Sequence, residues 1–550
     1  MAQPAASSGP PDTQAAPAAA DRRWVILVVV SVAQLMVVLD STIVNIALPS
    51  AQQALGFANS DRQWVVTSYA LAFGSLLLVG GRLGDMYSRK WVFITGLIGF
   101  AVASAIGGAS VNFAMLVGAR ALQGAFGAIL APAALGTLVS TFRDPRERGR
   151  AFAVFGSVAV GGGAVGLILG GVLTQYLSWR YTLFVNLIFA AIAVAGALAY
   201  ITSSRPAVRL RMDWPGAVLA CAGLFLIVFG FSHAETASWT ATLTLGSLIL
   251  GAVLLCGVGV AEQRSSHPLL PLRVILDRTR GGSYVAVGIT GIAIFAIFLF
   301  LTFYMQQVKG YSPLTTGLLF LPLVAGILVS STLYSAVGSR VGPRPLVTAG
   351  MLLGAGGTAW LAQLTVTSSY AGGVLPPLII MGLGFGAIFA PAINTATAGV
   401  PREDSGVASA LVNTMQQVGG SIGISVLSTI AASATTSYLL AHHASPQAPA
   451  VAATRGYTLA FAISAALLGL GAILAILMLP SRKRLEGVTS EASALISGPE
   501  PEVAAPALAA PSAAPSQAAS GLNPAVRVIP VGLLCCSPVI DAGLTRSPGR

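Results

Sequence analysis

Fourteen long apolar runs divide this chain of 550 residues, and they constrain the fold more than any other feature of the sequence. Each run is close to the about 20 residues that an α-helix needs to cross a bilayer. Only helices can cross in so many separate segments, because lipid offers no hydrogen-bond partner to an unpaired backbone group. We therefore expect an all-α membrane protein with fourteen transmembrane helices. The predicted spans are 24–48, 63–81, 91–109, 114–140, 151–173, 182–201, 215–232, 242–261, 283–307, 316–338, 345–364, 374–398, 406–431 and 457–479.

The distribution of charge indicates the topology. Only 9% of the residues are charged, against about 25% in soluble domains. If the N-terminus is cytoplasmic, 22 lysines and arginines fall in cytoplasmic segments and four in outside loops. Because cytoplasmic loops carry an excess of these residues, both termini are predicted to be cytoplasmic. The same bias explains the net charge of +12, so we expect the lipid bilayer, and no nucleic acid, as the partner of these charges.

The chain repeats itself at an offset of 256 to 259 residues. Residues 126–133 read FGAILAPA and residues 385–392 read FGAIFAPA, and a Pro-Arg-Glu sequence follows each of them. Both copies enter the membrane from the same side, so this is a parallel repeat of two halves. The predicted parts are a disordered tail over 1–22, a six-helix half over 23–201, an inserted helix pair with its linkers over 202–282, a second six-helix half over 283–480 and a disordered tail over 481–550.

Asp40 is the only acidic residue that lies well inside a predicted span. A carboxylate at such a depth costs roughly 2.5–3.5 kcal/mol on insertion scales, so it indicates a function. The alternative is a helix-end aspartate that reaches water. Arg120 is the only basic residue inside a span, and it lies at a depth similar to that of Asp40 by the 1.5 Å rise of a helix. Arg120 can instead snorkel to a headgroup. If the two residues pair, burial favours neutral Asp40 and the arginine favours its ionised form, so a change in their separation can load and release a proton.

Residues 39–49, which read LDSTIVNIALP, carry the most specific resemblance in the chain. Together with Arg120-Ala121-Leu122-Gln123-Gly124, they make residues 23–480 similar to the 14-helix drug:proton antiporters of the major facilitator superfamily. The resemblance implies alternating access between two halves, and it implies that Asp40 and Arg120 take part in proton coupling. It also implies a bacterial cytoplasmic (inner) membrane as the location, and we expect the protein to be a monomer.

Two further stretches resemble motifs of this family. The loop between the second and third spans resembles the cytoplasmic gate motif in Gly81, Gly84, Asp85, Arg89 and Lys90. An ordinary basic cytoplasmic loop is the alternative. In the fifth span, Gly162, Gly166 and Gly170 recur at intervals of four and make a bare stripe for close helix packing. The family's antiporter motif has a proline where this chain has Leu167, so we expect the packing without a proline-linked kink.

Neutral polar residues inside the spans are candidates for the lining of a central substrate cavity. Hydrogen bonds between helices are the alternative for each of them taken singly. The candidates are Asn45, Gln123, Asn186, Tyr304, Gln307, Asn394, Asn413 and Gln417.

The sequence shows no enzyme signature. It has no phosphate-binding Gly-x-x-x-x-Gly-Lys sequence, and its four histidines fall in loops without a carboxylate cluster, so we expect no cofactor and no metal. Our hypothesis is a proton-coupled transporter that exports hydrophobic or amphipathic small molecules, with a small-molecule substrate and protons as its ligands. The alternatives are an exporter of one metabolite or self-made antibiotic, and a membrane receptor without transport.

Overall fold

The computed structural model describes residues 16–142, 144–203, 213–264, 277–398, 400, 405–441 and 447–482. All of them belong to the first of two compact units, Met1–Ile496, and the second unit is Ser497–Arg550. Most of the two predicted disordered tails, 1–22 and 481–550, lies outside the described residues.

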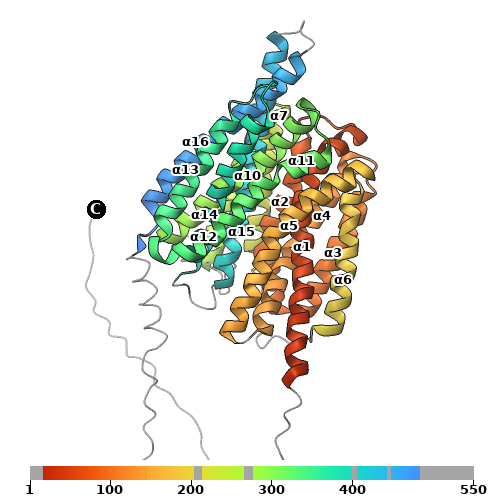
Figure 1. Ribbon diagram of the computed structural model, residues 1–550, viewed down its shortest axis with the longest axis vertical. Helices are drawn as coiled ribbons and strands as arrows, with labels where there is room; N and C mark the ends of the chain where they lie inside the picture. The colour runs from red at the N-terminus through yellow and green to blue at the C-terminus, as the bar shows by residue number, and fades with distance from the viewer. Residues whose placement is uncertain are drawn as a thin grey trace, which may run out of the picture. The chain divides into compact units, whose positions relative to one another are not determined.

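The first half of the chain contributes six helices (Figure 1). They are α1 (Ala16–Leu55), α2 (Arg62–Met86), α3 (Arg89–Gly108), α4 (Phe113–Thr141), α5 (Pro145–Tyr176) and α6 (Tyr181–Tyr200). Polar caps define two of these helix starts. The side chain of Asn112 accepts a hydrogen bond from Met115 N, and Asp144 accepts bonds from two amides of the first turn of α5. These bonds satisfy amides that have no partner within the helix.

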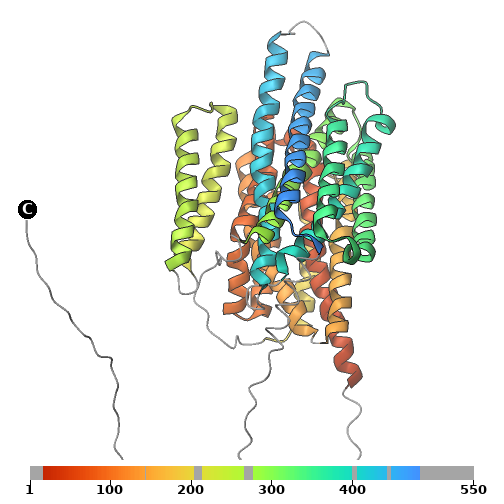
Figure 2. The same cartoon turned by 90° about the vertical axis from the view of Figure 1, so that its left-hand side faces the viewer.

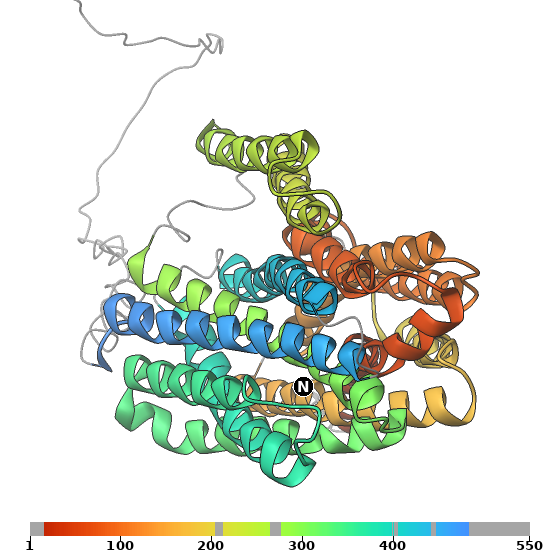
Figure 3. The same cartoon turned by 90° about the horizontal axis from the view of Figure 1, so that it is seen from above.

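Two inserted helices follow, α7 (Trp214–Thr236) and α8 (Thr242–Arg264). They form a hairpin at one side of the bundle, drawn in yellow-green in Figures 2 and 3. The helix α7 packs on both α2 and the later helix α15.

The second half is again helical, with three π-helical segments. Its elements are α10 (Arg278–Ala296), η1 (Ile297–Leu301), η2 (Tyr304–Val308), α11 (Pro313–Leu319), α12 (Leu321–Val341), α13 (Pro343–Leu361), η3 (Tyr370–Val374), α14 (Leu375–Thr397), α15 (Ser405–Ala441) and α16 (Ala448–Met478).

Thirteen helical segments of the described residues are long and apolar enough to cross a membrane. The fourteenth predicted span, 345–364, coincides with α13, which begins Pro-Arg-Pro and is rich in glycine. These residues lower its hydropathy but leave the helix intact. The predicted fold of fourteen helices is therefore confirmed.

The two six-helix halves repeat the same packing. In the first half α4 packs on α2 and α3, and α1 packs on α5 and α6. In the second half α14 packs on α12 and α13, and α10 packs on α15 and α16. The duplicated FGAI(L/F)APA sequence lies in α4 and α14, the equivalent helices of the two halves.

The two halves share an apolar core at one end of the bundle, and this core continues through the second half toward the other end. We call the end at which α1 begins and α16 ends the tail end, and the opposite end the far end (Figure 1). The largest buried cluster draws on both halves, with residues such as Ile46, Val65, Phe303 and Tyr457 near the far end. A second cluster lies mainly in the first half, and a third lies in the second half around Tyr284 and the start of α15.

Candidate functional site

A buried ion pair lies inside the first half. The carboxylate of Asp40 on α1 has no exposed surface, and the side chain of Arg120 on α4 is 2% exposed. Nη1 of Arg120 donates to Oδ2 of Asp40 at 2.6 Å. A pair as deep as this one is stable only when further hydrogen bonds satisfy the remaining polar atoms.

Two amides supply those bonds to the carboxylate. Nε2 of Gln123 on α4 donates to Oδ1 of Asp40 at 3.0 Å, and Nδ2 of Asn186 on α6 donates to the same atom at 2.8 Å. Both amides also donate to Oγ of Ser104 on α3, at 2.5 and 3.1 Å. The carboxylate is therefore held by residues of two helices besides its own, and a third helix holds the amides in place.

The guanidinium of Arg120 has partners beyond the carboxylate. Its Nε donates to the carbonyl oxygen of Val65 at 3.2 Å, and Nη1 also donates to Oε1 of Gln123 at 2.9 Å. Cζ lies 4.4 Å from the centroid of the Tyr69 ring, so a cation–π contact adds to these bonds. Val65 and Tyr69 both lie on α2, and the ion pair is thus tied to the helix that faces the second half.

Asn186 retains one unused group. Its Oδ1 is buried and has no hydrogen-bond partner among the described residues. If the amide rotates by half a turn, this oxygen takes the place of the Nδ2 that now faces Asp40. A protonated carboxyl needs such an acceptor for its O–H, so the cluster has a partner for both the ionised and the neutral form of Asp40.

The predicted gate motif lies around the turn between α2 and α3, and its residues are Gly81, Gly84, Asp85, Arg89 and Lys90. Nη1 of Arg89 donates to the carbonyl oxygen of Gly136 on α4, and Nζ of Lys90 donates to that of Leu198 on α6. These bonds tie the turn to its own half at the tail end. The side chain of Asp85 lies outside the described part of the structure, so the gate role stays a prediction.

The glycine stripe of α5 faces α1. A methyl group at Gly162 would meet Leu35, one at Gly166 would meet Thr42, and one at Gly170 would meet Ile43. The stripe therefore packs two helices of the first half together. The contact of α5 with the second half lies elsewhere, where Leu167 meets Gly317 of α11 and Gly171 meets Leu314.

The predicted cavity residues fall into separate groups. Gln123 and Asn186 belong to the Asp40 cluster. Tyr304 is buried and donates its hydroxyl hydrogen bond to the carbonyl oxygen of Thr365. The other members show no common centre, and a shared cavity stays a prediction for them. Of these, Gln307, Asn394 and Asn413 are exposed, Asn45 donates to the carbonyl of Ser41 in its own helix, and Gln417 contacts Gly74 of α2.

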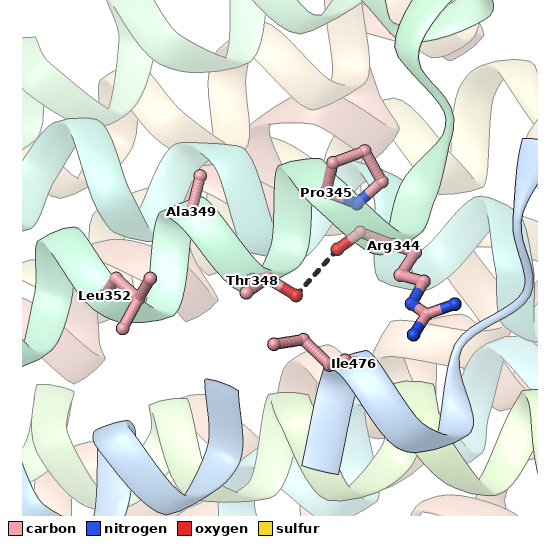
Figure 4. Close-up of a pocket in the computed structure, with 6 residues that line it drawn as sticks. All are labelled: Arg344, Pro345, Thr348, Ala349, Leu352 and Ile476. Atoms are coloured by element: carbon pink, nitrogen blue, oxygen red, sulfur yellow. Dashed lines mark hydrogen bonds between the residues drawn. The ribbon is translucent and has the colours of Figure 1, made fainter. Parts of the chain in front are cut away.

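A pocket of about 370 Å³ lies between α13 and α16 (Figure 4). It contains none of the predicted cavity residues. Its lining is Arg344, Pro345, Thr348, Ala349, Leu352 and Ile476, and Oγ1 of Thr348 donates to the carbonyl oxygen of Arg344. It belongs to the second half, whereas the Asp40 cluster lies wholly within the first.

Sequence reasoning missed four residues that the structure brings into important contacts. Ser104 and Tyr69 complete the Asp40 cluster, and Arg62 and Gln306 join the two halves at the far end. Tyr69 lies two turns after the start of α2, which places it at the depth of Arg120 and was an available signal. A serine in a helix of this kind gives no such signal, because it commonly bonds to its own backbone.

The protein family follows from a match of the sequence to a known family. Residues 30–424 match the Major Facilitator Superfamily. The chain belongs to this superfamily. As a member, it is a multi-pass membrane transporter and not an enzyme, and the resemblance inferred from residues 39–49 is confirmed.

Several bacterial proteins are similar over most of the chain. The puromycin resistance protein pur8 of Streptomyces alboniger is 44% identical over 494 residues, which cover 89% of this chain and 98% of that protein. The cephamycin export protein CmcT of Amycolatopsis lactamdurans is 40% identical over 74% of this chain and 85% of that protein. The tetracenomycin C resistance and export protein of Streptomyces glaucescens is 34% identical, covering 75% and 76% respectively.

Solved transporter structures share the fold. The crystal structure of the POT family transporter PepTSo superposes with a TM-score of 0.63 at 14% identity, covering 85% of this chain and 98% of that one. An inward-facing bacterial homologue of the human lysosomal transporter Spinster gives a TM-score of 0.57 at 15% identity, with 85% and 98% coverage. At these identities the likeness concerns the fold alone.

Proposed function

We propose that the protein is a proton-coupled exporter of hydrophobic or amphipathic small molecules, antibiotics among them, that works by alternating access in a bacterial cytoplasmic membrane. Three similar proteins are named for resistance to an antibiotic or for its export. The tail end is the cytoplasmic side in this proposal, as the bias of lysine and arginine indicates.

The buried Asp40–Arg120 pair is the observation that carries the coupling to protons. Protonation of Asp40 would remove the charge that Arg120 now neutralises, and the buried guanidinium would then lack an anion. Such a change costs several kcal/mol unless the helices move. Proton binding therefore favours another arrangement of α1, α4 and α6, and release of the proton favours the present one. Alternating access needs such a pair of states.

The present arrangement is closed at the far end, where the halves share a core. Hydrogen bonds reinforce this closure. Nε2 of Gln306 donates to the carbonyl oxygen of Ile46 at 3.0 Å, and the backbone N of Leu314 donates to Oε1 of Gln175 at 3.3 Å. With the far end outside, this closure supports our assignment of the present arrangement to the state that takes up substrate from the cytoplasm.

Proteoliposomes with an imposed pH gradient test the proposal. Asp40→Asn should abolish gradient-driven accumulation of substrate, because the side chain can no longer bind and release a proton. Glu147→Gln is the matched control, since it removes a carboxylate of an ion pair with Arg23 that is about one-third exposed. It should transport like the wild type. Gradient-driven transport by Asp40→Asn at the wild-type rate would exclude the proton role.

A narrower substrate range is the second candidate, and the names of the similar proteins favour it because three of them refer to single antibiotics. Competition between chemically unrelated compounds in the same proteoliposomes distinguishes a narrow substrate range from a broad one. Inhibition by one structural class only would support a dedicated exporter, and inhibition by several would support a multidrug exporter.

A further inference from the structure

Arg62 is a buried cation at the junction of the two halves. It is the first residue of α2, at the far end, and it is 6% exposed. Its Nη1 donates to the hydroxyl oxygen of Tyr457 on α16 at 3.2 Å, whereas Nε is buried without a hydrogen-bond partner among the described residues. A side chain of the first half is thus inserted into the second half.

Three aromatic rings of the second half enclose this guanidinium. Cζ lies 4.4 Å from the ring centroid of Phe303, 5.3 Å from that of Tyr457 and 5.8 Å from that of Phe300. All three side chains are buried. We call Phe300, Phe303 and Tyr457 the aromatic cage. Each distance is within the about 6 Å over which a ring attracts a cation.

The cage stabilises the cation without a counterion. In the described part of the chain, no carboxylate lies within ion-pair distance of Arg62, unlike Arg120 with its Asp40. The three rings and the hydroxyl of Tyr457 therefore compensate for the lost hydration of the guanidinium. Phe300 and Phe303 also lie where the helix changes to the π-helical segments η1 and η2, an irregularity that is frequent at functional sites.

In the alternating-access cycle proposed above, Arg62 cannot stay in the cage throughout. Opening of the far end separates α2 from the second half, and this movement withdraws Arg62 from the three rings. The empty cage then faces the opening through which the substrate leaves. Aromatic cages of this composition bind organic ammonium ions.

We propose that Phe300, Phe303 and Tyr457 form an exit site for organic ammonium substrates and that Arg62 is the built-in cation that competes for it. This inference rests on the proposed export function and specifies a substrate class for it. When the far end closes, Arg62 re-enters the cage and displaces the bound ammonium ion to the outside. This competition lowers the affinity of the exit site for the ammonium ion in the closed state, and the lower affinity favours release of the ion.

Equilibrium binding of choline to the full-length protein in lipid nanodiscs tests the proposal. Choline carries a quaternary ammonium group, and 3,3-dimethylbutan-1-ol is its uncharged isostere. Arg62→Gln removes the internal cation and should bind choline about tenfold more tightly than the wild type. Arg62→Lys keeps a cation and should bind choline as weakly as the wild type. The isostere should show no gain with either variant.

Two further variants distinguish a cation-binding site from a general weakening of the contacts that close the far end. Gln306→Ala removes a hydrogen bond between the halves but leaves Arg62 in place, so it should gain far less choline affinity than Arg62→Gln. Phe303→Ala combined with Arg62→Gln should lose the gain. The proposal is overturned if Arg62→Gln shows no gain, if the isostere gains equally, or if the gain survives Phe303→Ala. Because choline binding needs no proton gradient, the binding result can be interpreted even if the protein does not catalyse proton-coupled export.

Discussion

The Asp40–Arg120 pair predicts that its two single variants lose different amounts of folding stability. Asp40→Asn leaves a buried guanidinium that cannot lose its proton. It should destabilise the protein by about 3–5 kcal/mol, the usual cost of breaking a buried pair on one side. Arg120→Met leaves a buried carboxylate, which can become neutral by binding a proton. Arg120→Met should therefore be the milder of the two single variants.

The carboxylate left in Arg120→Met also keeps two hydrogen bonds. Nε2 of Gln123 and Nδ2 of Asn186 donate to Oδ1 of Asp40 independently of Arg120. Its loss of stability should therefore stay below that of Asp40→Asn.

The double variant Asp40→Asn/Arg120→Met completes the cycle. It contains no unpaired charge, and Gln123 and Asn186 can bond to an asparagine at position 40. Its stability should lie within about 1 kcal/mol of the wild type, so the coupling energy should be at least about 2 kcal/mol, with the cost of Arg120→Met adding to that value. Glu147→Gln, which breaks the pair with Arg23 that is about one-third exposed, should cost less than about 1 kcal/mol.

Reversible unfolding by SDS in mixed micelles, followed by circular dichroism, measures all of these free energies. Two outcomes would contradict the prediction: equal losses of stability in the two single variants, or a loss in the double variant equal to their sum. Either result would mean that the two side chains do not compensate each other's charge in the folded protein.

Other variants test the packing and the helix starts in the same assay. Gly166→Ala should cost roughly 1–3 kcal/mol, because its methyl group would meet Thr42. Gly163→Ala should be neutral or stabilising, because no atom lies within 4 Å of its Cβ. Equal effects of the two variants would contradict the close packing of α5 on α1. Asn112→Ala removes the cap of α4 and should cost about 1 kcal/mol, while Asn112→Asp should restore it.

The fold was predictable because hydropathy decides which segments cross a bilayer. The ends of the helices were less predictable. α1 continues to Leu55 and α15 to Ala441, beyond the apolar runs that predicted them, since the ends of a helix outside the apolar layer need no apolar residues. The π-helical segments had no sequence signal either, because they arise from packing of the helix against its neighbours.

The candidate site was predictable in part. Depth along two helices indicated that Asp40 and Arg120 lie at one level, and the structure brings them together. Gln123 follows Arg120 by three residues and so shares its helix face. Arg62 is one of the four basic residues that the sequence predicts in outside loops, because a sequence does not show whether a cation near a helix start is hydrated or enclosed by rings from a distant helix. Only the contacts of Arg62 with the three rings reveal the cage.

The first two turns of α2 connect the candidate proton site to the far end. Arg62 enters the aromatic cage, and Val65, three residues or about 4.5 Å further along the helix, accepts the bond from Nε of Arg120. One more turn brings Tyr69 over the same guanidinium. A movement of Arg120 on protonation of Asp40 therefore acts on the segment of α2 that positions Arg62.

This connection makes a specific prediction for transport. Arg62→Gln weakens the closed far end, so less proton binding is needed to open it, and the pH at which transport is half-maximal should move upward. Gln306→Ala also weakens closure, but it does so through α1 and away from the Arg120 bond to Val65. Its shift should be smaller than that of Arg62→Gln. Initial rates in proteoliposomes over a range of pH give both values, and an unchanged pH profile in Arg62→Gln would show that α2 does not couple the two sites.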